Sequence, residues 1–234
     1  MAEPPEPPVL LSGRADGFLS TEHWSLLSSR SLAWNESFSR VSVFLNSLSA
    51  SAVALALVAD ASGFDDEFKI FALVLFPIVL FLGVATYVRI VQINLEDVYL
   101  VRAMNRLRRA YVDGAPEIHD YFTTGVSDDE AGVVASYLHG RPQTTRPWAQ
   151  FIVSTPTVVA TLNAVIATVG AGALAIHLGA SGVALVVLCL GIFLSCWAGL
   201  FSLQLRALRT ARQSVARFPS DKVFATTPET NKKA

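Results

Sequence analysis

One carboxylate stands out as a candidate for chemistry or for a structural ion pair. Asp97 lies in the stretch QINLEDVYLVRAMNRLRRAY (92–111), where a helical pattern separates apolar residues from arginines. On this helix Asp97 falls about 40° from Ile93, on the side away from the arginines. Because burying an unpaired charge is costly, we predict an interhelical ion pair that fixes helix register, with a hydrated carboxylate as the alternative. The arginines considered are Arg30, Arg40, Arg206 and Arg209, with Arg40 and Arg206 as the leading candidates.

The arginines of the same stretch suggest a second chemistry, contact with phosphate groups. Arg102, Arg106 and Arg109 share the polar face of the predicted helix, next to an apolar segment. Basic residues beside a membrane attract anionic lipid headgroups by about 1 kcal/mol each, so these three are predicted lipid contacts. Nucleic acid is not an expected partner, because acidic residues interrupt the patch and no nucleic-acid motif is present.

Residues of metal-ligand type gather between 119 and 139, but their spacing favours helix capping. No pair of histidines has ligand spacing, so we predict neither a metal nor a cofactor. Ser127-Asp128-Asp129-Glu130 has the form of a capping box, which predicts Ser127 as the N-cap of a short helix ending near His139. Pro116 is expected to open another short helix, EIHDYFTT.

Neutral polar and small residues form stripes inside the apolar segments. Such stripes favour close helix packing with hydrogen bonds between helices. The alternative is a pore lined by the first and third segments. Packing is favoured because no ionisable residue accompanies the stripes, and ion-coupled transport usually uses one. The stripes are Ser42, Asn46 and Ser49; Thr157, Thr161 and Thr168; and Gly191, Ser195 and Gly199.

Signatures of catalysis are missing from the sequence. It contains no HExxH, GxSxG or P-loop motif, no paired acids within an apolar segment, and no Ser-His-Asp grouping that one compartment would hold. The chain is therefore predicted not to be an enzyme.

The elements that position all these residues are predicted to be membrane-spanning helices. The 234 residues are 52% hydrophobic and 16% charged, with a mean hydropathy of +0.46, which is too apolar for an ordinary soluble domain. Four segments are long enough to span a bilayer. Short connectors, DASGFDDEFK and HLGASG, predict two antiparallel hairpins. The fold class is thus an all-α integral membrane protein with spans at 41–59, 70–88, 151–176 and 183–205.

The distribution of basic residues predicts the orientation. Of the 18 lysines and arginines, all except Lys69 fall on one side of the predicted spans. By the positive-inside rule, both termini and the loop at 89–150 are expected in the cytoplasm. The first forty residues lack a signal-peptide pattern, so the first span is expected to remain as an anchor.

Helical patterns continue beyond three of the spans on the cytoplasmic side. We predict that the first, second and fourth helices extend into a cytoplasmic stalk. For residues 20–40 the alternative is an interfacial helix, lying flat with its tryptophans at headgroup level. The predicted divisions are a disordered Pro-rich segment 1–19; a cytoplasmic helix with the first two spans and the extension of the second, 20–112; a loop with two short helices, 113–146; the last two spans with an extension, 147–217; and a disordered tail, 218–234.

Three stretches carry a resemblance to a known group. SLLSSRSLAWNESFSR, INLEDVYLVRAMNRLRRAY and YFTTGVSDDEAG are similar to segments of an uncharacterised family of four-span integral membrane proteins of actinobacteria, and the likeness runs from about Leu11 to Arg217. The resemblance implies a bacterial cytoplasmic (inner) membrane. It carries over no activity and no functional residue.

Two function classes remain from the sequence. The favoured one is a non-enzymatic scaffold or regulatory membrane protein, homo-oligomeric, whose stalk engages a cytoplasmic protein partner or anionic lipid. The alternative is an oligomeric channel for small solutes or ions, lined by the first and third spans.

Overall fold

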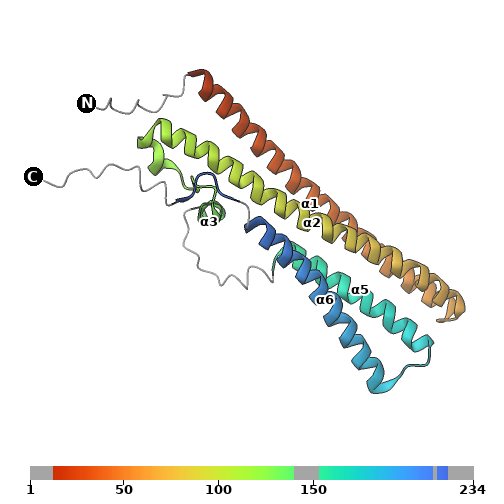
Figure 1. The fold of residues 1–234 in the computed structure, drawn as a ribbon. Helices are drawn as coiled ribbons and strands as arrows, with labels where there is room; N and C mark the ends of the chain where they lie inside the picture. The colour runs from red at the N-terminus through yellow and green to blue at the C-terminus, as the bar shows by residue number, and fades with distance from the viewer. Residues whose placement is uncertain (1–12, 140–152, 213–214, 221–234) are drawn as a thin grey trace, which may run out of the picture. The chain divides into compact units, whose positions relative to one another are not determined.

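The protein is built from helices in all parts that the structure describes. The computed structural model describes residues 13–139, 153–212 and 215–220, and no strand occurs in these ranges. Two short helices interrupt a series of four long ones (Figure 1). In chain order the helices are α1 (Gly13–Ser62), α2 (Asp66–Gly114), η1 (Pro116–Tyr121), α3 (Glu130–Leu138), α5 (Thr155–His177) and α6 (Gly182–Arg212).

The four long helices are each long and apolar enough to cross a membrane. The predicted spans 41–59, 70–88 and 183–205 lie within α1, α2 and α6, and α5 covers the predicted third span from residue 155 onward. The predicted start of that span, 151–152, lies outside the described residues. The expectation of an all-helical fold with four helices long and apolar enough to span a membrane is confirmed for the described residues.

Two helix boundaries differ from the predicted ones. Helix α1 begins at Gly13, so residues 13–19 are helical rather than disordered, whereas 1–12 lie outside the described residues. Residues 20–40 continue without a break into the first span. Helix α6 ends at Arg212 and does not reach residue 217. The backbone N–H groups of Arg217 and Phe218 donate to the Asp128 carboxylate instead of to carbonyls of a preceding helical turn.

The loop after α2 contains both expected short helices. Pro116 is the first residue of η1, a 3-10 helix shorter than the predicted one. Proline has no backbone N–H, and at the start of a helix this costs nothing because the first N–H groups have no partner within the helix. Helix α3 ends at Leu138, and His139 closes it in the left-handed conformation with φ 50°.

The chain divides into two compact units, which are described separately. The first unit comprises Met1–Ala33, Leu95–Thr144 and Thr210–Ala234; the second comprises Trp34–Asn94 and Thr145–Arg209. Helices α1 and α2 contribute to both units, and most of the first unit's described residues come from them and from the loop that follows α2.

The second unit has an apolar core formed by all four long helices. At one point α1, α2 and α5 meet closely, because a side chain at Gly83 would collide with the Asn163 side chain and with Phe44. The Tyr87 hydroxyl donates to the Leu200 carbonyl at 2.5 Å and so joins α2 to α6. The core residues are Phe44, Val79, Tyr87, Ile90, Val159, Ala160, Ile166 and Leu200.

The first unit buries about as many polar residues as apolar ones. Its apolar core is small and includes Val101, Met104, Val126 and Val133. Buried polar groups must find partners inside the protein, and these partners define the candidate site. The buried polar residues of this unit are Asp97, Arg102, Asn105, Arg109, Ser127, Asp128 and Ser136.

Candidate functional site

Asp97 joins three helices of the first unit. Its residue is 2% exposed, and its carboxylate accepts hydrogen bonds from Arg30 Nε at 2.6 Å and from Arg30 Nη2 at 3.3 Å. The Tyr137 hydroxyl donates at 2.7 Å to Oδ2, the carboxylate oxygen that also accepts from Arg30 Nη2. The Arg30 guanidinium also lies 5.8 Å from the centre of the Tyr137 ring. Asp97 on α2 is thereby tied to α1 through Arg30 and to α3 through Tyr137.

The electrostatics of this cluster favour a structural role. Burial raises the pKa of Tyr137, and the hydrogen bond to Asp97 raises it further, so the hydroxyl keeps its proton at neutral pH. Burial alone would lower the pKa of Arg30, but the hydrogen bond and charge of Asp97 outweigh it and raise the pKa. The group is a neutralised ion pair with a tyrosine donor, which is an arrangement that holds helices together.

The partner of Asp97 differs from the leading candidates. Arg30 occupies the position, whereas Arg40 donates to Glu36 at 2.8 Å, one helical turn away. Arg89 also binds Glu36 at 2.8 Å, and the two arginines hold the pKa of Glu36 at about 2, with Arg89 the larger cause. Arg206 is exposed on α6.

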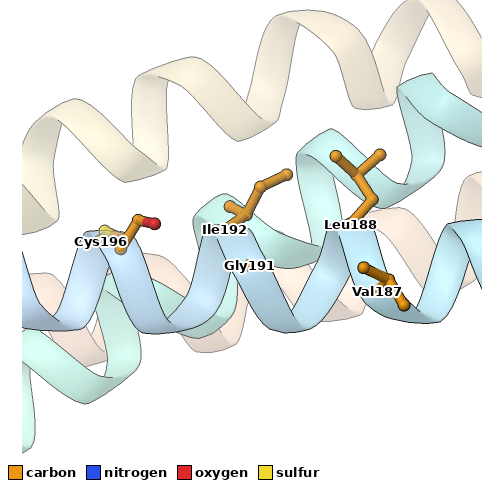
Figure 2. Close-up of a pocket in the computed structure, with 6 residues that line it drawn as sticks. Val187, Leu188, Gly191, Ile192 and Cys196 are labelled. Atoms are coloured by element: carbon orange, nitrogen blue, oxygen red, sulfur yellow. The ribbon is translucent and has the colours of Figure 1, made fainter.

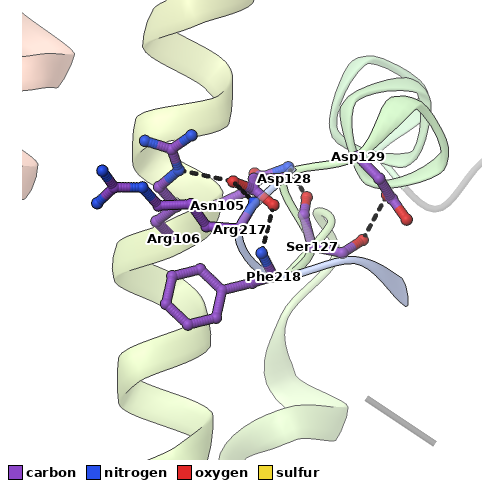
Figure 3. A network of polar contacts seen from close by, with 7 residues as sticks. All are labelled: Asn105, Arg106, Ser127, Asp128, Asp129, Arg217 and Phe218. Carbon is purple, nitrogen blue, oxygen red and sulfur yellow. Dashed lines mark hydrogen bonds and ion pairs between the residues drawn. The ribbon is translucent and has the colours of Figure 1, made fainter. Parts of the chain in front are cut away.

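Asp128 binds the segment that follows α6 (Figure 3). Its fully buried carboxylate accepts hydrogen bonds from the backbone N–H groups of Arg217 at 3.0 Å and Phe218 at 2.8 Å. The backbone N–H of Asp128 donates to the Phe218 carbonyl at 3.2 Å. On its other side the carboxylate pairs with Arg106 Nε of α2 at 2.7 Å. Asp128 thus fixes α2, its own turn and the segment after α6 at one point.

Asp129 extends the same contact and caps α3. One carboxylate oxygen accepts from the backbone N–H of Gly132 at 2.8 Å and from the Ser127 hydroxyl at 3.0 Å. The other accepts from the backbone N–H of Ser220 at 2.7 Å. The predicted capping box is therefore wrong in its register: Asp129, not Ser127, is the N-cap, and Ser127 donates to it. We call Asp128 and Asp129, together with the backbone of residues 217–220, the tail clamp.

Both carboxyl groups of the tail clamp are ionised at neutral pH. Burial alone would raise the pKa of Asp128, but hydrogen bonds from Arg217, Arg106 and Phe218 together hold it below its ordinary value. Burial would likewise raise the pKa of Asp129, and the donors on Ser220, Gly132 and Ser127 outweigh it to bring the pKa to about 2.

A buried amide supports the tail clamp from α2. Asn105 is fully buried, and its Nδ2 donates to the Ser127 carbonyl at 2.8 Å. Its Oδ1 accepts from the Ser136 hydroxyl at 2.8 Å and from Arg108 Nη1 at 2.7 Å. Both Nδ2 and Oδ1 of Asn105 therefore have hydrogen-bond partners, and these bonds fix the position of the turn at 127–129 on α2.

The three arginines predicted to bind lipid headgroups are engaged within the first unit. Arg102 and Arg109 are 5% and 7% exposed, too little for a surface patch. Arg109 Nε binds Asp113 Oδ1 at 2.7 Å, and Arg106 is the partner of Asp128. Their guanidinium groups serve the packing of the unit.

The stripes predicted as alternative pore lining do not share one environment. Ser42, Asn46 and Ser49 are exposed on α1. Thr157 is 4% exposed, and Thr161 accepts a hydrogen bond from Trp197 Nε1 of α6 at 3.2 Å. The threonine hydroxyls at 161 and 168 donate to carbonyls of their own helix. The threonine stripe therefore packs inside the second unit, whereas the serine and asparagine stripe faces outward.

One face of α6 carries a shallow apolar depression (Figure 2). It is lined by Val187, Leu188, Gly191, Ile192, Ser195 and Cys196. Ser195 supplies the only side-chain hydroxyl of this lining, so the depression lacks the convergent polar groups that orient a small-molecule ligand. Gly191 and Gly199 have open space where a side chain would stand, so the small-residue stripe of α6 makes no close helix contact within the described residues.

The candidate metal ligands do not gather into one group in the described part of the chain. No group of three His, Cys, Asp or Glu side chains lies close enough there to hold a metal ion. The carboxylate oxygens of Asp128 and Asp129 accept hydrogen bonds from backbone N–H groups, and Asp128 also pairs with Arg106.

Sequence reasoning missed the partners that come from far along the chain. Tyr137 lies 40 residues from Asp97, and Arg217 lies 89 residues from Asp128. A tyrosine on the short helix α3 has no pattern that points to α2. The only usable signal was the pair of adjacent carboxylates, which offers more acceptors than one helix cap needs.

Comparison with protein families, with characterised proteins and with solved structures finds no match for this chain.

Proposed function

We propose that this protein is a non-enzymatic membrane scaffold or regulatory protein that works as a homo-oligomer. In this proposal the four long helices cross the cytoplasmic membrane of a bacterium as two antiparallel hairpins. The positive-inside distribution of Lys and Arg puts both termini and the first unit in the cytoplasm. The first unit is the helical stalk, through which the protein engages a cytoplasmic partner.

The observation that carries the proposal is how the first unit uses its charges. The carboxylates of Asp97, Asp128 and Asp129 all accept hydrogen bonds from donors of the same unit. These bonds hold α1, α2, α3 and the segment after α6 together. These three carboxylates are therefore engaged in holding the unit together. The unit does expose large apolar side chains on α1, namely Phe18 at 70%, Trp24 at 67% and Leu32 at 69%.

These exposed apolar side chains favour a protein partner over anionic lipid. A partner buries aromatic and aliphatic residues at the centre of an interface, where Trp and Phe contribute most. A lipid surface would instead require accessible guanidinium groups. Arg102 and Arg109 are buried, and Arg106, whose side chain is 37% exposed, is paired with Asp128. The likeness to actinobacterial membrane proteins supports the bacterial setting.

The contacts of the second unit count against the alternative, an oligomeric channel lined by α1 and α5. Thr157 is buried and Thr161 is bonded to Trp197, so the α5 half of the lining is used in packing. A proteoliposome assay for ion and small-solute flux separates the two functions: the scaffold proposal expects no flux above empty vesicles.

Site-specific photo-cross-linking in cells tests the partner surface. A photoreactive residue is placed at Phe18, Trp24 or Leu32 of the full chain, with Glu22 and Ser29, which are exposed polar positions of the same helix, as matched controls. We expect one recurring protein adduct at the apolar positions, lost on Trp24→Ala and Phe18→Ala. Adducts with lipid alone, or equal adducts at the control positions, would contradict a specific partner.

A further inference from the structure

Helix α1 has an exposed stripe that repeats every seven residues, and its first five members are Asn or Ser. Within the second unit it follows spacings of four and three without interruption, and every member is exposed. A strict seven-residue repeat is the pattern by which two helices pack along a left-handed seam. The residues are Asn35, Ser39, Ser42, Asn46, Ser49, Val53 and Ala56, which we call the α1 stripe.

The stripe faces away from the core of its own chain. Phe44, on the opposite side of α1, is fully buried and lies against the Gly83 and Asn163 contact. The Phe44 side of the helix is therefore inside the unit, and the α1 stripe is outside, flanked by exposed apolar side chains such as Val43 and Leu45. In a bilayer this arrangement is costly, because hydrocarbon offers no hydrogen-bond partner to an amide or hydroxyl.

Asn46 makes this cost specific. It lies within the predicted span, and its side chain forms no hydrogen bond with any described residue of the chain. Ser42 and Ser49, one turn away on either side, are also without a described partner. An amide carries two donors and an acceptor, so a second amide at the same depth is its natural complement.

We propose that the α1 stripe is the self-association surface of this protein, and that a second copy covers it in a parallel pair of α1 helices with Asn46 bonded to Asn46. Copies inserted in one membrane share one orientation, so two α1 helices that meet face to face are parallel. In a parallel two-fold pair each stripe residue meets its own symmetry mate, which places the two amides together. The small residues around them allow the backbones to approach.

The dimensions agree with a seam through most of the bilayer. From Ser42 to Ala56, the stripe residues within the predicted span, the helix rises about 21 Å of the roughly 30 Å thickness of the hydrocarbon layer, and Asn35 and Ser39 continue the stripe beyond the span. The next position of the repeat is Asp60, which lies just beyond the predicted span and whose charge ends the seam. The inference rests on the proposed function, because it names the partner and the surface of the homo-oligomer proposed above.

Disulfide cross-linking in native membranes tests the seam directly. Single cysteines are introduced into the full chain after Cys189→Ala and Cys196→Ala. We expect covalent dimers from Ser42→Cys, Asn46→Cys and Ser49→Cys, and none from Val43→Cys, Ala50→Cys or Ala52→Cys, which are exposed but off the stripe. Equal cross-linking at both sets of positions would overturn the inference.

Truncating the central amide measures its contribution. Asn46→Ala is expected to weaken dimerisation about three- to twentyfold in a detergent or nanodisc dilution series, and Asn46→Gln to weaken it less. Asn35→Ala is the matched control, since Asn35 is on the same stripe but outside the predicted span, where water competes; its expected loss is under about twofold. An Asn46→Ala loss no larger than that of Asn35→Ala would overturn the pairing.

Subunit counting by photobleaching of the wild-type chain in nanodiscs separates the two proposals. A monomer would overturn both the seam and the homo-oligomer. An oligomer that cross-links through Gly191→Cys and Ser195→Cys of α6, but not through the α1 stripe, would overturn only the inference. A dimer with the α1 pattern supports both.

Discussion

Arg30 and Asp97, 67 residues apart in the chain, form an ion pair at 2.6 Å that joins α1 to α2 inside the first unit. The carboxylate side chain is 3% exposed, whereas the arginine side chain is 26% exposed. Loss of the arginine therefore leaves a buried charge with Tyr137 as its remaining partner, and loss of the carboxylate leaves a cation that can still reach water.

This asymmetry predicts unequal effects of the two single substitutions. Arg30→Ala is expected to destabilise the protein by about 3 kcal/mol, the lower part of the range for an orphaned buried charge, and Asp97→Asn by less. The measurement is chemical unfolding of the purified protein in detergent, followed by tryptophan fluorescence. Asp66→Asn is the matched control, because its pair with Lys69 is exposed and such pairs contribute under about 1 kcal/mol. Equal losses from all three variants would contradict the interpretation.

The tail clamp predicts a site-specific change in proteolysis. The Asp128 carboxylate accepts hydrogen bonds from the backbone N–H groups of Arg217 and Phe218, the two residues joined by the peptide bond that trypsin would cleave. Removing this acceptor by Asp128→Ala breaks both bonds and the pair with Arg106, so the segment is expected to open more often and trypsin to cleave after Arg217 roughly tenfold faster.

Mass spectrometry of the fragments gives the rate at that bond alone. Asp120→Ala serves as the control, because Asp120 is almost fully exposed and belongs to the same loop. Wild-type cleavage at Arg217 as fast as in Asp128→Ala would show that the clamp does not protect the segment.

The sequence predicts the positions of the helices well and the partners of the buried carboxylates poorly, and Asp97 and Asp129 show the physical reason. Apolar runs and helical periodicity are local, so they placed the spanning helices and the continuation of α2 past residue 88. The helical pattern identifies Asp97 as a carboxylate near the apolar face, but it favours Arg40 and Arg206 as partners, whereas the fold brings Arg30 to it. The capping-box pattern predicts Ser127 as the N-cap, and nothing local shows that Asp129 is tied to Ser220, 91 residues later.

The same clamp predicts sensitivity to acid. The pKa of Asp129 is about 2 and that of Asp128 is lowered, compared with about 3.9 for an unfolded Asp. Because the folded-state values are the lower ones, the carboxylates contribute their full stability above about pH 4 and lose it as the pH falls through those values.

Hydrogen exchange of the segment measures this loss. After correction for the intrinsic rate, protection of the N–H groups of Arg217, Phe218 and Ser220 is expected to fall between about pH 4 and pH 2. The double variant Asp128→Asn and Asp129→Asn should show weak protection that does not change across the same window. Wild-type protection that persists unchanged to pH 2 would exclude the carboxylates as its source.

Close packing around Gly83 predicts a sharp contrast between two glycines of the second unit. A methyl group at position 83 would stand 2.7 Å from Phe44 Cε2 and still closer to the Asn163 side chain. Both neighbours are fully buried, so neither has room to move, and Gly83→Ala is expected to cost about 1 to 3 kcal/mol through overpacking. At Gly170 the same methyl group would lie 3.4 Å from Phe76 Cβ, an ordinary contact, so Gly170→Ala is expected to be neutral or slightly stabilising. Unfolding in detergent compares the two variants under one protocol. A Gly83→Ala protein as stable as the wild type would mean that α1, α2 and α5 do not meet as closely as these contacts require.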